Sequence, residues 1–270
     1  MDLNDYNDVR RTKAILYGPP KSGKTRQLAY LAEAGYTLWV VDGENGIKTL
    51  MNPEVLKPEF RKNVKLINMP DRRDYPVMFD GVRQILKGLD TKFCYLHGKD
   101  KCPLCAKEPG ARWADTLNLT KFGDKDILVI ETLTQLSNSA INKRTLKAWQ
   151  KDDEYKPTWD DFRAQGMDLD EVLGKIQVAN VNVLVTSHDV DVEKSESKEK
   201  IVPVAGTRNF SKISAKYFDE VIYLQVQNKK HSIYSSTMYS NNILTGGRSG
   251  IRLEDGEKQS IVDIFKGTKS

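Results

Sequence analysis

The stretch AILYGPPKSGKT, residues 14–25, decides the fold of this chain. Its first four residues are apolar, as in a buried β-strand, and the segment RQLAYLAEA that follows carries good helix formers. Between them the sequence matches G-x-x-x-x-G-K-[S/T] in full, in the strand–loop–helix context that this motif requires. A strand joined to a helix through such a loop predicts an α/β fold that binds the phosphates of a nucleotide.

The residue types of the loop explain how a phosphate would be held. Glycine lets the backbone turn its N–H groups inward, and the following helix adds its positive N-terminal end. Lys24 is expected to reach the β and γ phosphates of ATP, and the hydroxyl of Thr25 to bind Mg²⁺. The alternative is a plain glycine-rich turn between strand and helix. The expected nucleotide-binding residues are Gly18, Pro19, Pro20, Lys21, Ser22, Gly23, Lys24 and Thr25.

The composition is that of an ordinary globular protein, with 270 residues, 42 Lys+Arg against 37 Asp+Glu, and 39% hydrophobic residues. No stretch approaches the roughly 18 to 20 consecutive apolar residues of a membrane helix, and the start lacks the apolar core of a signal peptide. We therefore expect a cytoplasmic protein without a membrane partner. The net charge of +5 neither requires nor opposes a nucleic-acid partner, and three cysteines argue against a disulfide framework.

Short apolar runs alternate with longer segments of mixed polarity along the chain. This pattern favours a parallel-rich central sheet flanked by helices, in one domain over residues 1–270. Helices are expected at Thr25–Ala34, Asp168–Ala179 and, from a less regular pattern, Tyr75–Lys87. The expected strands are Ala14–Tyr17, Thr37–Val41, Val64–Ile67, Ile127–Ile130, Val181–Thr186 and Val221–Gln225.

Three segments do not fit this alternation and are predicted to be insertions or mobile loops. The first contains all the cysteines, the second is basic and aromatic, and the third is highly charged. They are Thr91–Gly110, Ser137–Gln165 and Asp189–Lys200.

Polar residues follow three of the expected strands, and the carboxyl ends of parallel strands meet at one edge of a sheet. Glu44, beyond the second strand, is expected to orient the attacking water, and Asp42 competes for this role. Glu131 ends the fourth strand and is expected to hold Mg²⁺. His188, after the fifth, would detect the γ phosphate. The alternatives are a turn acid for Glu44 and an ordinary surface or core histidine for His188.

These residues resemble the RecA-like P-loop ATPase core, and most closely the small phage-encoded ATPases associated with single-strand annealing and recombination. The resemblance implies that Asp42-Gly43-Glu44 ends in the general base, that Glu131 is the magnesium acid and that His188 is the γ-phosphate sensor. It also implies a ring or filament of identical subunits that acts on single-stranded DNA. Glu131 and His188 depart from the family in residue type.

The run Gly246-Gly247-Arg248-Ser249-Gly250 resembles a basic pair that related ring and filament ATPases carry near a late hairpin. There, Lys-x-Arg reaches the γ phosphate of the neighbouring subunit. Here Arg248 is present, and Gly246 stands where the lysine would be. The resemblance implies that Arg248 is catalytic in the neighbouring subunit, and the alternative is an arginine in an exposed glycine-rich turn.

All three cysteines and one of the three histidines lie within twelve residues. The order Cys-x2-His-x4-Cys-x2-Cys supplies four ligands of the kind that tetrahedral zinc prefers. Four protein ligands leave no position for water, so a structural zinc site is predicted, in an insertion at residues 91–113. Unrelated free thiols are the alternative, and the basic, aromatic flanks suit nucleic acid or a docked protein equally. The expected ligands are Cys94, His97, Cys102 and Cys105.

The resemblance also indicates where DNA would bind, because RecA-like cores contact it through the loops after the magnesium and sensor strands. These loops correspond to Ser137–Gln165 and Asp189–Phe210. In the first, cations can neutralise phosphates and indoles can stack on unpaired bases, and the second becomes basic near Arg208. The alternatives are a solvated helix face for the first and a disordered surface loop for the second. The expected DNA contacts are Lys143, Arg144, Lys147, Arg208 and Lys212.

Together, residues and resemblance predict an enzyme that hydrolyses ATP, with DNA stimulation, in phage recombination or replication in the host cytoplasm. Its expected cofactors are Mg²⁺ and Zn²⁺, and a single-strand-binding protein or other replication proteins are further candidate partners. Three other functions stay open: a helicase loader or other partner-remodelling ATPase, a nucleotide or small-molecule kinase, and a nucleotide-gated scaffold. A kinase should carry an arginine-rich lid, and no obvious one is present.

Overall fold

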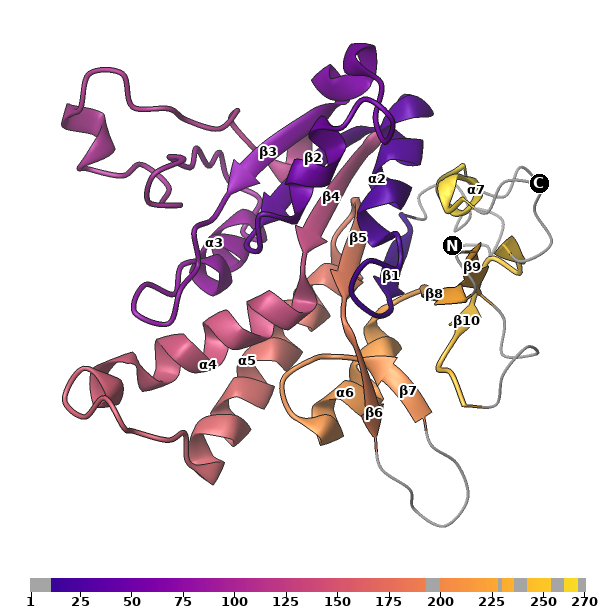
Figure 1. Cartoon of the computed structure of the whole chain (residues 1–270). Helices are drawn as coiled ribbons and strands as arrows, with labels where there is room; N and C mark the ends of the chain where they lie inside the picture. The colour runs from indigo at the N-terminus through magenta and orange to yellow at the C-terminus, as the bar shows by residue number, and fades with distance from the viewer. Residues whose placement is uncertain (1–10, 193–199, 228–229, 236–241, 254–259, 267–270) are drawn as a thin grey trace, which may run out of the picture.

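Strands and helices alternate along the part of the chain that the computed structural model describes, residues 11–192, 200–227, 230–235, 242–253 and 260–266 (Figure 1). The strands are β1 (Lys13–Tyr17), β2 (Thr37–Asp42), β3 (Val64–Asn68), β4 (Asp126–Glu131), β5 (Asn182–Ser187), β6 (Asp189–Val192), β7 (Lys200–Pro203), β8 (Glu220–Gln227), β9 (Lys230–Tyr234) and β10 (Gly246–Gly247). The α-helices are α2 (Lys24–Glu33), α3 (Met78–Ile85), α4 (Leu133–Trp149), α5 (Trp159–Val178), α6 (Arg208–Ser214) and α7 (Val262–Phe265). Short 3₁₀ helices are η2 (Gly46–Met51), η3 (Pro58–Asn63), η4 (Cys105–Lys107), η5 (Leu119–Lys121) and η6 (Ala215–Tyr217). Among the described residues, none of the helices combines the length and the apolar character needed to cross a membrane.

The central sheet has the strand order β10-β8-β1-β5-β4-β2-β3, and β9 also pairs with β8. Strands β1, β2, β3, β4, β5 and β8 run parallel, whereas β9 and β10 run antiparallel to β8. The register aligns Tyr17 with Ser187 and Asp42 with Glu131. The chain therefore leaves β1, β2, β4 and β5 at one edge, which we call the carboxyl edge. In Figure 1 it faces the end of the molecule where α4, α5, α6 and the β6–β7 hairpin gather.

Two hydrophobic cores cover the two faces of the sheet, because side chains alternate along each strand. On β1, Ile15 and Tyr17 belong to the first core, whereas Ala14 and Leu16 belong to the second. Helices α3, α4 and α5 pack on the first face, and α2 and α7 pack on the second. This arrangement holds the carboxyl edge as a rigid platform for the loops that follow the strands.

The predicted α/β fold, with a parallel-rich central sheet flanked by helices, is confirmed. All six predicted strands are present, and each agrees with the prediction to within two residues at either end. The predicted helix after the phosphate loop is α2, and the less regular pattern at Tyr75–Lys87 contains the shorter helix α3.

The prediction of an insertion or mobile loop at Ser137–Gln165 is wrong, because most of this segment lies in α4 and α5. Helix α5 begins at Trp159, where the side chain of Thr158 and that of Asp161 form a capping box. The buried face of α4 includes Ser137, Ser139 and Ala140. Small and hydroxylated residues on a buried face interrupt the apolar spacing from which helices are predicted.

The prediction for Asp189–Lys200 is wrong at both ends of the segment. Residues 189–192 form β6, which pairs antiparallel with β7, and Asp189 lies opposite Pro203. Val192 and Val202 are buried, so the hairpin has an apolar side that the surrounding charges conceal in the sequence. Residues 193–199 lie outside the described part of the chain.

Residues 91–113 form an irregular excursion that rests against the edge strand β3. The side chain of Asn68 donates a hydrogen bond to the carbonyl of Tyr95 (3.0 Å), and the Tyr95 hydroxyl donates to that of Leu66 (3.2 Å). Gly98 packs closely on Met69 and Pro70. A Cβ on Gly98 would lie 3.1 Å from the Cα of Met69. This excursion, which we call the insertion, thus docks beside β3 and α3 and projects from that side of the molecule (magenta in Figure 1).

Candidate active site

The phosphate loop leaves β1 at the carboxyl edge and ends in α2, as the sequence predicts. Gly18 (φ 152°) and Gly23 (φ 101°) have backbone conformations that favour glycine. A Cβ on Gly18 would also lie 2.1 Å from the carbonyl oxygen of Leu224 on β8. The Gly18 amide donates to the carbonyl of Ser187 (3.3 Å), so the loop is tied to the end of β5. Pro20 and Lys21 form its exposed tip.

Lys24, the first residue of α2, holds its ammonium group inside the loop. Its Nζ donates to the carbonyls of Gly18 (2.7 Å) and Pro19 (2.9 Å), and the residue is 7% exposed. Burial lowers the pKa of this amine, and the negative charge of Glu131 acts in the opposite direction. The loop therefore places a largely buried cation among backbone groups where a phosphate would bind.

Glu131 lies at the end of β4 with 4% of its surface exposed. Its Oε2 accepts a hydrogen bond from the Thr186 hydroxyl (2.5 Å). Burial raises the pKa of this carboxyl group to about 7, the charge of Asp42 adds to the rise, and Thr186 and Lys24 oppose it. A divalent cation would favour the ionised form. The carboxylate of Glu131, with the hydroxyl of Thr25 in the first turn of α2, is a donor set that fits Mg²⁺.

Glu44 lies beyond β2 and is held by two groups that directly follow β4 and β5. Its Oε1 accepts a hydrogen bond from the Thr132 hydroxyl (2.7 Å), and its Oε2 lies 3.5 Å from Nε2 of His188. The Glu44 side chain is 28% exposed. Burial acts to raise the pKa of its carboxyl group, but the contacts with His188 and Thr132 outweigh burial and lower it. Glu44 is thus an ionised carboxylate, open to water, on the same edge as Lys24.

The structure gives Asp42 a different task from that of Glu44. Its side-chain oxygens accept hydrogen bonds from the backbone amides of Glu44 (3.1 Å), Gly46 (3.2 Å) and Ile47 (3.3 Å). The residue is 1% exposed. Because its oxygens hold the turn after β2, Asp42 fixes the backbone that carries Glu44, and Glu44 is the acid that water can reach.

Three threonines of this edge were not predicted from the sequence. Thr132 binds Glu44, Thr186 binds Glu131, and the Thr134 hydroxyl accepts a hydrogen bond from the His188 amide (3.1 Å). One sequence signal was available, since Thr132 and Gln135 have the T-x-x-Q spacing of a helix start, and Thr132 does cap α4. The partners of Thr186 and Thr134 depend on strand order, for which no local signal exists.

His231 on β9 is a further residue that sequence reasoning missed. Its Nδ1 lies 3.0 Å from the carbonyl oxygen of Ser22 in the phosphate loop. A Cβ on Gly23 would come within 3.1 Å of the same nitrogen. The β8–β9 pair therefore supports the phosphate loop on the side away from β5.

The phosphate loop lies where the parallel strands end, whereas Arg248 lies where they begin. It follows β10, whose Gly247 pairs with Glu220 at the start of β8. Its guanidinium group contacts Asp219 (3.0 Å), and the Asp219 side chain also accepts a hydrogen bond from the amide of Lys13, the first residue of β1. The structure therefore does not bring Arg248 to Lys24 of the same chain.

The five predicted DNA contacts lie on two helices. On α4, Lys143 forms an ion pair with Asp80, and Arg144 forms two hydrogen bonds of 2.6 Å with Asp168 of α5. Lys147 is exposed on the same helix. The other two predicted contacts, Arg208 and Lys212, lie on α6, which begins after Thr207. Both side chains are exposed.

The predicted zinc ligands come together within the insertion. The ligand atoms of Cys94, His97, Cys102 and Cys105 all lie within 4.8 Å of one another. Nδ1 of His97 is 3.2 Å from the Cys105 sulfur and 3.5 Å from the Cys102 sulfur. Bond lengths of about 2.0–2.3 Å around tetrahedral zinc would require similar separations. The three sulfurs and one nitrogen therefore fit a closed, structural zinc site.

Backbone amides also favour a metal-binding thiolate in this cluster. The amides of Cys105 and then Leu104 help to lower the pKa of the Cys102 thiol to about 7. Burial, together with the neighbouring thiols, raises that of Cys105 to about 12. Ionisation of one thiol makes ionisation of the neighbouring thiols less favourable. A divalent cation would offset this repulsion by neutralising the charge of the ligand set.

Comparison with known proteins identifies a matching family. A family model described as an AAA domain matches residues 10–249, which is most of the chain. No curated protein matches the chain. The matched range contains the phosphate loop, Glu44, Glu131 and His188.

Proposed function

Because the chain belongs to the AAA domain family of P-loop ATPases, we propose that it hydrolyses ATP while acting on single-stranded DNA, in phage recombination or replication. Nucleotide binding and ATPase activity follow from the family. The DNA substrate and the phage setting rest on the resemblance stated above and on the cations of α4 and α6. In this proposal the protein works in the cytoplasm, that of the host cell if a phage encodes it.

The observation that carries hydrolysis is the position of Glu44 beside the phosphate loop. Thr132 and His188 hold its carboxylate in the ionised form, and a carboxylate at this position accepts a proton from an attacking water. Lys24 stabilises the negative charge that develops on the transferred phosphoryl group. Mg²⁺, which Thr25 and Glu131 would hold, supplies further charge stabilisation when bound.

His188 supports a link between the nucleotide and the rest of the molecule. One ring nitrogen faces Glu44, and the peptide that follows Ser187 leads directly into the β6–β7 hairpin. The Ser187 hydroxyl also donates to the carbonyl of Val204 (2.9 Å) beyond β7. A γ phosphate that attracts His188 would thus act on the segment between β5 and α6, and this segment leads into the helix that carries Arg208 and Lys212.

Assembly and zinc complete the proposal. Arg248 lies at the edge opposite its own phosphate loop, so a catalytic role for it requires a neighbouring subunit, as in a ring or filament. We also propose that the Cys94, His97, Cys102 and Cys105 cluster binds one Zn²⁺, which stabilises the insertion.

ATP turnover of wild type, Lys24→Ala and Glu44→Gln, with and without single-stranded DNA, tests the function. Both variants should lose turnover about 100-fold or more, and Glu44→Gln should keep nucleotide affinity better than Lys24→Ala. The exposed Glu54, changed to Gln, is the matched control and should behave as wild type.

Three results would change the proposal in different ways. Wild-type turnover in Glu44→Gln would remove Glu44 as the base. Turnover that DNA does not raise would favour a partner-remodelling ATPase such as a helicase loader. Phosphate transfer to a nucleotide or another small acceptor in place of water would favour a kinase.

A further inference from the structure

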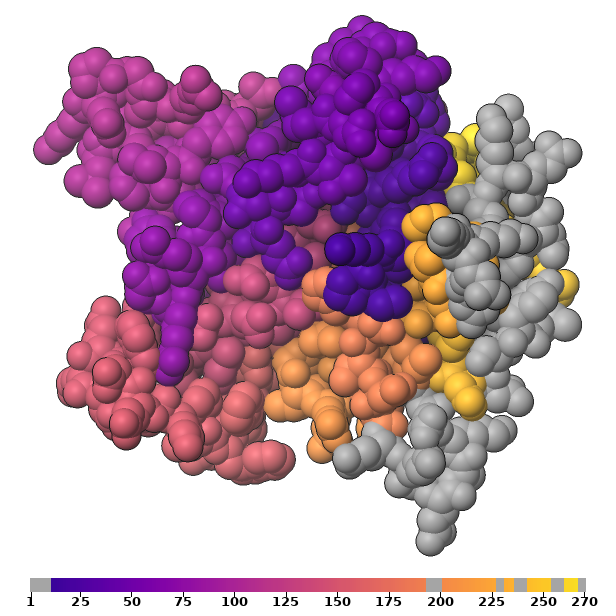
Figure 2. All heavy atoms as spheres, in the orientation of Figure 1, coloured from indigo at the N-terminus to yellow at the C-terminus, as the bar shows by residue number. Residues whose placement is uncertain are grey.

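A cleft of about 550 Å³ lies apart from the phosphate loop, between α3, α4 and the insertion. Figure 2 shows the insertion (magenta) and the turn between α4 and α5 (rose) as two projections on one side of the molecule. Leu146 of α4, Gln84 of α3 and Phe93 of the insertion all line the cleft. It therefore joins two regions that the sequence marks separately as basic and aromatic.

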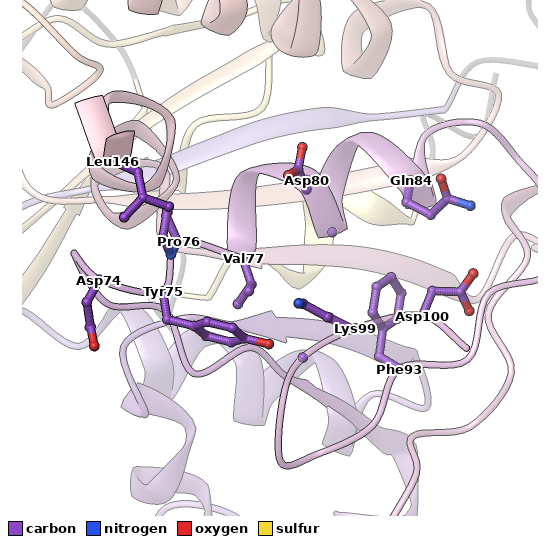
Figure 3. A pocket seen from close by; sticks show the side chains of 12 residues that line it. Asp74, Tyr75, Pro76, Val77, Asp80, Gln84, Phe93, Lys99, Asp100 and Leu146 are labelled. Atoms are coloured by element: carbon purple, nitrogen blue, oxygen red, sulfur yellow. The ribbon is translucent and has the colours of Figure 1, made fainter. Parts of the chain in front are cut away.

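Two aromatic rings and one lysine share the interior of this cleft (Figure 3). The Tyr75 hydroxyl donates to the carbonyl of His97 (3.2 Å), a bond that fixes the ring against the insertion. The ammonium group of Lys99 lies 5.0 Å from the centre of the Tyr75 ring, and the Phe93 ring stands beyond it. An aromatic face next to a cation suits a flat, polar ring that is attached to a phosphate.

Three carboxylates also line the cleft, and each has a partner within the chain. Asp74 is paired with Arg72 and Asp80 with Lys143, while Asp100 accepts a hydrogen bond from the Lys92 amide (2.6 Å). Among the described residues, no ion pair includes Lys99. Two of the acids are thus in ion pairs and Asp100 is held by a backbone amide, while the ammonium group of Lys99 contacts only the Tyr75 ring among the interactions described.

Residues next to the lining in sequence, which we call the rim, add further positive charge. The guanidinium of Arg73, next to the lining residue Asp74, lies 4.9 Å from the ring centre of Trp149. Trp149 follows Leu146 by one helical turn, and Lys147 is exposed beside it. Cations at the rim and aromatic rings inside are the arrangement that holds a sugar–phosphate backbone with its bases turned inward.

We propose that this cleft binds one unpaired nucleotide of single-stranded DNA. Its base stacks on Tyr75, and Lys99, with Arg73 and Lys147 at the rim, attracts the adjoining phosphates. Gln84 and Asp100 supply polar groups at the cleft wall for the edge of the base. This assignment rests on the proposed DNA-dependent function and adds a contact that involves the insertion.

Anisotropy of a labelled single-stranded oligothymidylate tests the cleft on zinc-containing protein, with magnesium and a non-hydrolysable ATP analogue present. Tyr75→Leu should weaken binding about 5- to 100-fold because the stacking surface is lost, whereas Tyr75→Phe keeps the ring and should remain within about 3-fold of wild type. Lys99→Gln should reduce the slope of log affinity against log salt by about 0.7, and the exposed Lys62, changed to Gln, should not.

The outcomes separate the cleft from the function on which it rests. If wild type does not bind the oligonucleotide, the DNA-dependent function fails and the cleft assignment fails with it. If wild type binds but Tyr75→Leu and Lys99→Gln bind equally well, the cleft assignment alone is overturned, and a protein partner becomes the better occupant. The melting temperature and zinc content of each variant are measured first. If Tyr75→Leu does not fold, the binding of Lys99→Gln alone tests the cleft.

A photocrosslink provides a readout that a general loss of charge would not change. An oligonucleotide that carries 5-iodouracil should attach to peptides containing Tyr75 or Phe93, and Tyr75→Leu should reduce this attachment. Crosslinks confined to residues 200–216 would place the bases on the α6 side and overturn the assignment.

Discussion

Buried charge is the main electrostatic feature of the carboxyl edge at the scale of single residues. Lys24 and Glu131 are both nearly excluded from water, and each favours the charged form of the other. Such a pair is costly in isolation, because desolvation of two charges can exceed their attraction. A bound triphosphate and its cation would offset this cost, because ligands that bind only the folded state stabilise it.

Glu131→Gln should change the pH dependence of stability. The pKa of Glu131 is raised from 4.5 to about 7 in the folded chain, so the folded state holds this proton more tightly than the unfolded state does. Ionisation then costs stability as pH rises through this window, by about 3 kcal/mol in total. Without magnesium or nucleotide, Glu131→Gln should melt above wild type at pH 8 and approach it near pH 4, below both pKa values.

Glu44→Gln is the matched control for this titration, because the pKa of Glu44 is lowered. A lowered carboxyl pKa contributes stability above the unfolded-state value and loses it as pH falls. Glu44→Gln should therefore show no gain at pH 8. A difference between Glu131→Gln and wild type that stays constant from pH 5 to 8 would contradict the prediction.

At the scale of elements, the α4–α5 pair shows how charge can be structural where the sequence suggested DNA contact. Two hydrogen bonds between Arg144 and Asp168 join the helices. In their buried interface, the side chain of Gln165 donates a hydrogen bond to the carbonyl of Ser137 (2.7 Å). The Asp168 side chain is 10% exposed. Arg144 is engaged within the chain, whereas Lys147, three residues later, is exposed.

Arg144→Met should destabilise the protein by about 1–3 kcal/mol, because it leaves the carboxylate of Asp168 without its partner. Lys147→Met, which removes an exposed charge from the same helix, should change stability by less than about 0.5 kcal/mol. Urea unfolding midpoints of the two variants measure this difference. Equal midpoints would show that the pair contributes nothing measurable.

The insertion depends on a small cluster for its order, because apart from the short 3₁₀ helix η4 its described backbone forms only isolated bridges, such as that between Cys94 and Trp113. We expect one zinc per chain, and Cys105→Ser should lose the metal and lower the melting temperature. Ala106→Ser places the same side chain one residue away and should keep both. Wild-type protein that contains no zinc after purification in zinc-supplied medium would contradict the prediction.

At the scale of the whole molecule, the sheet separates two groups that the function would use together. The phosphate loop follows β1 at the carboxyl edge, and Arg248 lies beside Asp219, next to the first residue of the same strand. A parallel sheet thus presents its nucleotide site at one end and this arginine at the other. Two copies stacked end to end would bring the arginine of one toward the nucleotide of the next.

Mixing two inactive variants tests this arrangement. Lys24→Ala lacks a working nucleotide site but keeps Arg248, and Arg248→Ala has the reverse defect. If Arg248 acts on a neighbour, a mixture should hydrolyse ATP faster than the sum of the separate variants, with a maximum at an intermediate ratio. Turnover equal to that sum at every ratio would assign Arg248 to its pair with Asp219 alone.

Sequence reasoning succeeded where the information lies within a few neighbouring residues. The phosphate loop, the apolar strands and the Cys/His cluster each follow from residue types at fixed short spacing. It failed on α4, where Ser137 and Ser139 occupy a buried face, and on the β6–β7 hairpin, where charged residues surround two buried valines. Secondary structure is predicted locally from the spacing of apolar residues. Helix α4 buries serines, and the β6–β7 hairpin buries only a few valines among charged residues, so neither shows that spacing.

The amino-acid sequence alone determined that a phosphate-loop motif follows β1, that carboxylates stand at the ends of strands, and that three cysteines and a histidine lie within twelve residues. Only the tertiary structure decided which of these groups meet. Thr132 reaches Glu44 across 88 positions of sequence, and Tyr75 meets Lys99 through the docking of the insertion on β3. Such contacts depend on strand order and on the packing of distant segments, and neither is encoded by any short run of residues.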